Sequence, residues 1–168
     1  LCFPFDHPLR SRIGNNWAIT KPKIEDLTME QQELCREIFK NLTSEDGYDR
    51  YMRQMDDDYG GFEGYHIAIF GEPDTDKPFE WVLSGRHDTL RADGNSVPKA
   101  AFGGPIVYGH GEEDPKQNLF LYQTQQVNEV FKALDANQSK QALVEKAPKE
   151  DAVTLQGDQG KFPGISVG

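Results

Sequence analysis

The stretch YHIAIFGEPDTDKPFEWVLSGRHDTLRA, from Tyr65 to Ala92, decides the fold of this chain. It contains two compact runs rich in β-branched and aromatic residues, Tyr65–Gly71 and Phe79–Gly85, and the turn-rich linker EPDTDKP separates them. Runs of this length, bounded by Gly, Pro and Asp, are typical of two β-strands joined in a hairpin. The segment HDTLRA, which follows the second run, continues the pattern as a third strand.

A fourth strand is predicted in AAFGGPIVYGHG, residues 100–111, where Gly103, Gly104 and Pro105 bend the chain. Consecutive strands with short links pair antiparallel, because parallel pairing needs a long crossover connection. We therefore expect an antiparallel meander of about four strands within residues 62–112.

Helices are predicted on both sides of this sheet along the sequence. A helical pair is expected over residues 28–59, since Thr28 and Gln31 match a capping box and Thr43-Ser44 can cap a second helix. Apolar residues return to helical spacing over residues 117–146. Within that segment we expect an interruption at residues 135–139 and then a short helix.

The two ends of the chain look irregular. Residues 1–27, spaced by prolines, are expected to form an extended arm, and residues 147–168 a loop-rich tail. Helices, then strands, then helices predict an α+β fold, with the meander packed against N-terminal and C-terminal helices in a single domain over residues 1–168.

Composition limits the classes of partner. The chain of 168 residues has 28 acidic and 18 basic residues, a net charge of −10, which repels phosphate and argues against nucleic acid as a partner. No apolar run approaches the roughly 18 to 20 residues that span a bilayer, so we expect no transmembrane segment. Cys2 and Cys35 form no metal or redox motif, and Cys35 is expected to be a buried free thiol. The chain starts without Met, so we expect a processed or truncated product from which any signal peptide is missing.

Two histidines follow glycine-containing bends at predicted strand ends, His87 in SGRH and His110 in YGHG. If the third and fourth strands are neighbours, the two imidazoles lie close together and can hold a divalent metal ion. The candidates for a completing carboxylate are Asp88, Glu112 and Glu80. Alternatively, one imidazole is a general base, because the unperturbed pKa of histidine is close to working pH. The third interpretation is that each histidine caps its bend by hydrogen-bonding a carbonyl group.

Charged residues near this segment also admit two interpretations. Arg86 and Arg91 can clamp an anionic group bidentately, or they can pair with neighbouring acidic side chains. The run Asp56–Asp58 can attract a hard cation, but successive carboxylates at a helix end point in different directions, which favours a solvated charge run. His66, inside a strand with apolar neighbours on both faces, is expected to be a hydrogen-bonded histidine of the core.

Six segments, in this order, resemble family 3500 of the bacterial domains of unknown function (DUF3500), most closely its planctomycete-like members. They are NNWAITKP, LTMEQQELCREIFKNL, HIAIFGEP, FEWVLSGRHDTLRADGNS, AFGGPIVYGHG and KFPGISVG, and together they cover essentially the whole chain. Many relatives read Gly-His-His where this chain has Gly85, Arg86 and His87. The resemblance implies export from a bacterial cell and a chain that continues past this end with a further His-x-His strand; it supplies no activity.

Two functional hypotheses follow. In the first, His87 and Arg86 form a catalytic site, or His87 and His110 bind a metal ion, and Arg86 orients an anionic substrate group. In the second, the chain is a non-catalytic binding or assembly module of the cell envelope. Its aromatic surface, built from Trp17, Tyr108 and Phe120, would contact a protein or carbohydrate partner.

Overall fold

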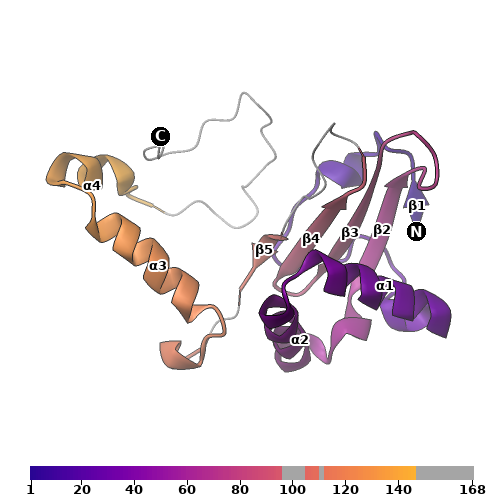
Figure 1. Cartoon of the computed structure of the whole chain (residues 1–168), viewed down its shortest axis with the longest axis horizontal. Helices are drawn as coiled ribbons and strands as arrows, with labels where there is room; N and C mark the ends of the chain where they lie inside the picture. The colour runs from indigo at the N-terminus through magenta and orange to yellow at the C-terminus, as the bar shows by residue number, and fades with distance from the viewer. Residues whose placement is uncertain (96–104, 110–111, 147–168) are drawn as a thin grey trace. The chain divides into compact units, whose positions relative to one another are not determined.

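A computed structural model describes residues 1–95, 105–109 and 112–146. In its sheet, the strands lie side by side in the order in which they occur along the chain (Figure 1). Its strands are β1 (Cys2–Phe3), β2 (His66–Gly71), β3 (Phe79–Gly85), β4 (Asp88–Asp93) and β5 (Pro105–Tyr108). Strands β2 to β5 pair antiparallel, whereas β1 pairs parallel with β2. The predicted α+β fold and four-stranded meander are therefore confirmed, with β1 as an addition that two residues of sequence could not signal.

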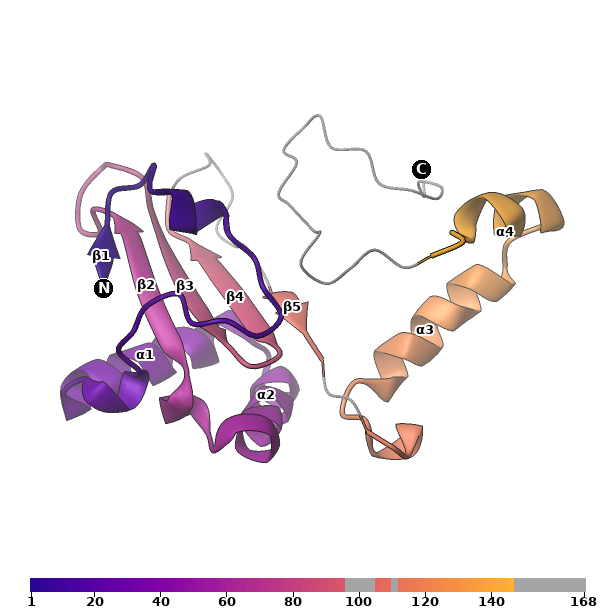
Figure 2. The ribbon, with the colours of Figure 1, turned by 180° about the vertical axis from the view of Figure 1, so that it is seen from behind.

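The arm covers one face of this sheet (Figure 2). Strand alternation turns Ala68, Phe70 and Val82 to that face, where they form an apolar cluster with Trp17 and Ile19 of the arm. The arm is more structured than predicted, since it contains β1 and two 3-10 helices, η1 (Pro8–Ser11) and η2 (Ile24–Asp26). Hydrogen bonds to the sheet also hold it, including that from the Ile19 amide to Ser84 Oγ at 2.9 Å.

The other face of the sheet carries α1 (Met29–Leu42) and α2 (Glu45–Tyr59) (Figure 1). Ile67, Leu83 and Leu90 lie side by side across β2, β3 and β4, and all three are buried. From the helices, Phe39 and Met55 are fully buried, and Phe39 packs on Phe62 of the 3-10 helix η3 (Phe62–Gly64). The core thus has two layers, which is why β2 and β3 have buried apolar residues on both faces.

The predicted helix caps are present. Thr28 Oγ1 accepts from the Gln31 amide while the Gln31 side chain accepts from the Thr28 amide, which completes the capping box of α1. Ser44 caps the start of α2 through the Gly47 amide, and Gly60, directly after the helix, is its C-cap with a φ of 78°, a conformation that favours glycine. Cys35 is buried and free, as predicted, and Cys2 is exposed and free.

Replacing Thr28 with alanine should lower the free energy of unfolding by about 1 kcal/mol, because the Gln31 amide at the start of α1 loses its acceptor. Urea denaturation measures this change. Thr28→Ser keeps the hydroxyl and is the matched control, expected to stay close to wild type. An equal loss in both variants would contradict a capping role.

The structure divides into two compact units, Leu1–His110 and Gly111–Gly168. In the second unit, the described elements are η4 (Pro115–Gln117), α3 (Leu121–Lys132) and α4 (Ala136–Ala142). The predicted interruption between two helices is present, but it covers residues 133–135 and not 135–139, because Asp135 caps α4 through the amides of Asn137 and Gln138. A single domain over residues 1–168, with the C-terminal helices packed on the sheet, stays a prediction.

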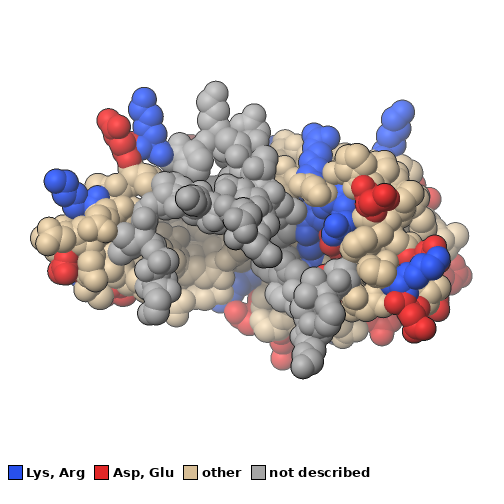
Figure 3. Space-filling model, turned by 90° about the horizontal axis from the view of Figure 1, so that it is seen from above, with Lys and Arg blue, Asp and Glu red and all other residues tan. Residues whose placement is uncertain are grey.

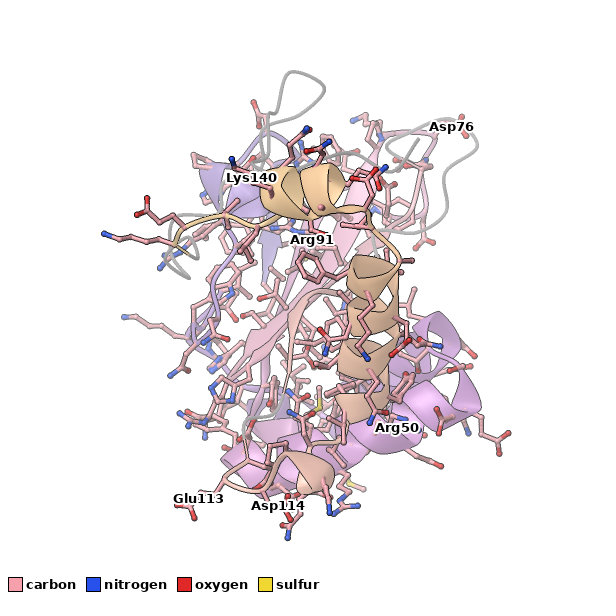
Figure 4. All side chains as sticks on the ribbon, turned by 90° about the vertical axis from the view of Figure 1, so that its left-hand side faces the viewer. Arg50, Asp76, Arg91, Glu113, Asp114 and Lys140 are labelled. Carbon is pink, nitrogen blue, oxygen red and sulfur yellow. The ribbon has the colours of Figure 1, made fainter. Side chains whose placement is uncertain are left out.

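Charges are spread over the first unit. On the face shown at the right of Figure 3, acidic and basic side chains are interspersed. Arg50 on α2 and Asp76 in the loop between β2 and β3 lie at opposite ends of this unit (Figure 4). Across the described part of the chain, every helix is too short or too polar to cross a bilayer.

Candidate functional site

The connection between β3 and β4 is a two-residue turn made of Arg86 and His87. Gly85 pairs with Asp88, which leaves only these two residues outside the ladder. His87 has a φ of 56°, in the left-handed region that costs most residues other than glycine roughly 1–2 kcal/mol. Gly85 is required for a different reason: a Cβ atom there would lie 2.2 Å from the ring of Tyr65.

Three side-chain or backbone groups from other segments hold the backbone of this turn. The Tyr65 hydroxyl donates to the Arg86 carbonyl at 2.8 Å, and Gln54 Nε2 on α2 donates to the His87 carbonyl at 3.0 Å. The His87 amide in turn donates to the carbonyl of Asn15 in the arm at 2.6 Å. Burial raises the pKa of the Tyr65 phenol, so this group remains a hydrogen-bond donor. The turn is therefore fixed from the helix layer and from the arm.

The His87 side chain forms a pair with a carboxylate from the end of α2. His87 Nδ1 lies 2.7 Å from Asp58 Oδ2, and because a carboxylate only accepts, the proton of a neutral imidazole sits on Nδ1. His87 Nε2 makes no hydrogen bond with the residues that the structure describes. Arg86 Nε lies 3.9 Å from Asp58 Oδ1, so the same carboxylate faces both turn residues. The side chains of Asp58, His87 and Arg86 are 11%, 27% and 41% exposed, in that order.

Beside this pair lies a buried carboxyl group. Asp88 is fully buried, and neither of its side-chain oxygens has a hydrogen-bond partner among the described residues; the same holds for Gln54 Oε1. Burial raises the pKa of Asp88 well above the usual range of an aspartate, which favours the neutral acid.

The other predicted site residues have different surroundings. Arg91 is buried and forms an ion pair with Glu80, which also binds Arg10, so Arg91 is not an anion clamp and Glu80 is not a free ligand. Glu112 belongs to the second unit and is exposed. His110 lies outside the described residues, and the predicted metal pair of His87 and His110 stays a prediction. Among residues 1–95, 105–109 and 112–146, no three His, Cys, Asp or Glu side chains are grouped to hold a metal ion.

The predicted aromatic surface is wrong for two of its three members. Trp17 and Phe120 are each only 8% exposed. Trp17 is held inward because its indole Nε1 donates to Thr89 Oγ1 at 2.9 Å while its ring packs in the arm cluster. Tyr108 is partly exposed and its ring centre lies 5.9 Å from that of Tyr51.

Sequence reasoning missed Asp58, which it assigned to a solvated charge run. Its partner His87 is 29 residues away, and no local pattern links a helix end to a turn at that distance. The one available signal was the Gly60-Gly61 break directly after α2, which turns the chain back toward the sheet. His66 was predicted correctly: it is buried, and its Nδ1 lies 3.0 Å from the Pro22 carbonyl.

Comparison with known proteins assigns the chain to a family but matches it to no individual protein. No curated protein and no solved structure gives a significant match. A family model described as protein of unknown function (DUF3500) matches residues 16–167, a range that includes strands β2 to β5, α1, α2 and the Arg86–His87 turn. The chain therefore belongs to the DUF3500 family, as its Gly-Arg-His strand end and flanking strands predicted.

Proposed function

We propose that the Arg86–His87 turn is an acid–base site that acts on a small anionic molecule. The observation that carries the proposal is the 2.7 Å contact between His87 Nδ1 and Asp58 Oδ2. A carboxylate on one ring nitrogen fixes the tautomer and orientation of an imidazole and stabilises its protonated form. The other nitrogen, Nε2, then has the lone pair with which a general base takes a proton.

The backbone of the turn supports the same proposal. A glycine at position 87 would adopt a φ of 56° without strain, yet the position holds a histidine whose backbone is fixed by Gln54 and Asn15. Left-handed residues other than glycine concentrate where function requires a particular side chain. The strain therefore favours a role for the imidazole beyond closing the hairpin.

Arg86 supplies the group that would hold the anion. Its guanidinium contacts Asp58 only at 3.9 Å, and no other carboxylate among the described residues pairs with it. Most of its five N–H donors thus remain available to a carboxylate in bidentate geometry.

A metal-dependent form of this site is the second candidate, and the same contact favours it. Metal-binding histidines commonly donate their second ring N–H to a carboxylate, as His87 does to Asp58, and His110 is the predicted companion ligand. Elemental analysis of the purified native protein decides between the two forms, because stoichiometric zinc or another divalent ion supports the metal form and a metal-free, active sample excludes it.

His87→Gln should slow proton transfer by this site by about 10²–10⁴-fold, the usual contribution of a positioned base. The measurement is hydrogen–deuterium exchange at the α-carbon of a panel of small carboxylic acids in D₂O, followed by proton NMR. Asp58→Asn should also slow the exchange, because the imidazole loses the acceptor that fixes its tautomer. Asp57→Asn, at the neighbouring position on α2, is the matched control and should match wild type.

Two outcomes would contradict the acid–base proposal. The first is wild-type exchange in His87→Gln. The second is a nitrogen NMR spectrum in which neutral His87 carries its proton on Nε2 and not on Nδ1, because Asp58 would then not orient the ring.

We also propose that the protein is exported from a bacterial cell. The support is its membership of DUF3500 together with the export that the resemblance implies. Cell fractionation with an antibody against this chain tests the proposal, and recovery in the cytosol alone would contradict it.

A further inference from the structure

We propose that a cavity beside the Arg86–His87 turn binds a small hydroxy acid, up to the size of one sugar acid. The cavity has a volume of about 220 Å³, and its walls include Asn16, Trp17, Tyr59, His66 and Arg86. This inference rests on the proposed function in one respect, the role of Arg86 as the anion-holding group. It adds the location, the further residues and the chemical class of the ligand.

The walls of the cavity are held in place before any ligand arrives. Asn16 forms an isolated antiparallel bridge with Arg86. The next residue, Trp17, donates its amide to the Gly85 carbonyl at 3.4 Å and its indole N–H to Thr89 at 2.9 Å. The arm is therefore attached to both β3 and β4 beside the cavity, and a ligand need not order it on binding.

Arg86 gives the cavity its cationic group. A guanidinium that lines a small cavity and has no strong ion pair attracts a carboxylate, which matches the planar fork of its N–H groups. Asn16, beside it, can both donate and accept hydrogen bonds. This end of the cavity therefore favours an anion.

His66 gives the cavity a hydrogen-bond acceptor. The Pro22 carbonyl can only accept, so His66 Nδ1, at 3.0 Å from it, carries the proton of the neutral ring. Nε2 is then an acceptor, and it has no hydrogen-bond partner among the described residues. His66 lines the cavity whereas Pro22 does not, so the ring edge with Nε2 is the one available to a ligand. A ligand that satisfies this nitrogen needs a donor, and a hydroxyl group is the simplest one that an organic acid can have.

Size and lining narrow the ligand further. A cavity of about 220 Å³ is smaller than the roughly 300–1,000 Å³ of sites for drug-sized molecules. Tyr59 adds aromatic surface beside the polar side chains of the cavity, and such a surface packs well against the apolar face of a sugar ring. A carboxylate, at least one hydroxyl and a compact carbon frame together describe a small hydroxy acid.

Titration of the ¹⁵N-labelled chain with glucuronate, followed by NMR, tests this inference. Two ligands of similar size are the controls: glucose lacks the carboxylate, and cyclohexanecarboxylate lacks the hydroxyl groups. We expect glucuronate to bind about tenfold more tightly than either control, the factor that corresponds to one good polar contact. Shifts should concentrate at residues 16–18, 59, 66 and 85–86.

Variants separate this inference from the acid–base proposal. Arg86→Gln should weaken glucuronate binding by about tenfold or more. His66→Gln should weaken it too, and Tyr59→Phe, which keeps the ring, should not. His87→Gln should slow the exchange reaction of the acid–base proposal but still allow glucuronate to bind, because His87 does not line the cavity, so the two proposals can fail separately. Glucuronate that binds no more tightly than glucose, or equally well to Arg86→Gln, would overturn the inference.

Discussion

Asp88→Asn should gain stability relative to wild type as the pH rises above 4, by up to about 1.4 kcal/mol for each pH unit over which the folded wild-type carboxyl group stays protonated. This is a large effect for one substitution, and its sign is the reverse of that for an ordinary buried contact.

The cause is the difference in the pKa of Asp88 between the two states. Burial raises the pKa of this carboxyl group well above 3.8, the value of an ordinary aspartate, and no partner among the described residues compensates its charge. The folded state therefore keeps a proton that the unfolded state releases as the pH rises. Stability from this group is complete below pH 3.8 and is lost progressively until the pH passes the pKa of the folded state. Asparagine has similar shape, cannot ionise and does not lose stability in this way.

Urea denaturation of both proteins at pH 4, 5, 6 and 7 measures the effect, and the difference between them removes the contributions of the other carboxylates. Asp57→Asn, at an exposed position on α2, is the control and should give a small difference that changes little with pH. A difference for Asp88→Asn that shrinks with rising pH would mean that the folded state stabilises the carboxylate, which would contradict the burial argument.

The fold could be predicted because its signals are local. The apolar run at residues 79–85 is bounded by Pro78 and by the Arg86–His87 turn, and β3 occupies the same residues. Thr28 and Ser44 fixed both helix starts through contacts no more than three residues away. A helix cap or a hairpin turn is determined by residues within a few positions of one another, so a single sequence is enough to predict it.

The site could be predicted only in part, because its decisive contacts join distant segments. Arg86 and His87 were identified from their place at a strand end, but Asp58, Tyr65 and Gln54 reach them from 21 to 33 residues away. The cavity also needs Asn16 from the arm, and nothing in an irregular, proline-spaced segment indicates where it crosses a sheet. The local sequence therefore identified candidate residues, but their roles depend on tertiary contacts that the local sequence does not show.

Charged groups on the two faces of the sheet show why burial alone does not determine a role. Asp88 is buried without a partner among the described residues, whereas Glu80 is buried with two, Arg91 and Arg10. Burial raises the pKa of the Asp88 carboxyl group, which favours its protonated form. Glu80 is an acceptor in a network that also includes the Arg12 carbonyl, to which Arg91 donates at 2.6 Å. Because η1 and the residue after it supply Arg10 and Arg12, this network fastens the arm to β3 and β4.

Glu80→Ala should therefore lower the free energy of unfolding by about 3–5 kcal/mol, the cost of removing one member of a buried ion pair. The side chain of Arg91 is 6% exposed, and without Glu80 its charge would stay in the core with no carboxylate to compensate it. Arg10 would lose its carboxylate as well, so the arm should loosen over the sheet. Urea denaturation gives the first quantity, and faster amide hydrogen exchange at residues 10–19 reports the second.

A double substitution tests whether the loss comes from the unpaired charge or from the missing contacts. In Glu80→Leu with Arg91→Met, both charges are gone and apolar side chains fill similar volumes, so stability should recover to within about 1–2 kcal/mol of wild type. Glu72→Ala, which breaks the exposed pair with Lys77, is the matched control for an ion pair in water and should cost less than about 1 kcal/mol. A loss in Glu80→Ala as small as in Glu72→Ala would mean that water reaches Arg91. A double variant as unstable as Glu80→Ala would mean that the ion pair itself, and not the avoidance of a buried lone charge, holds the arm on the sheet.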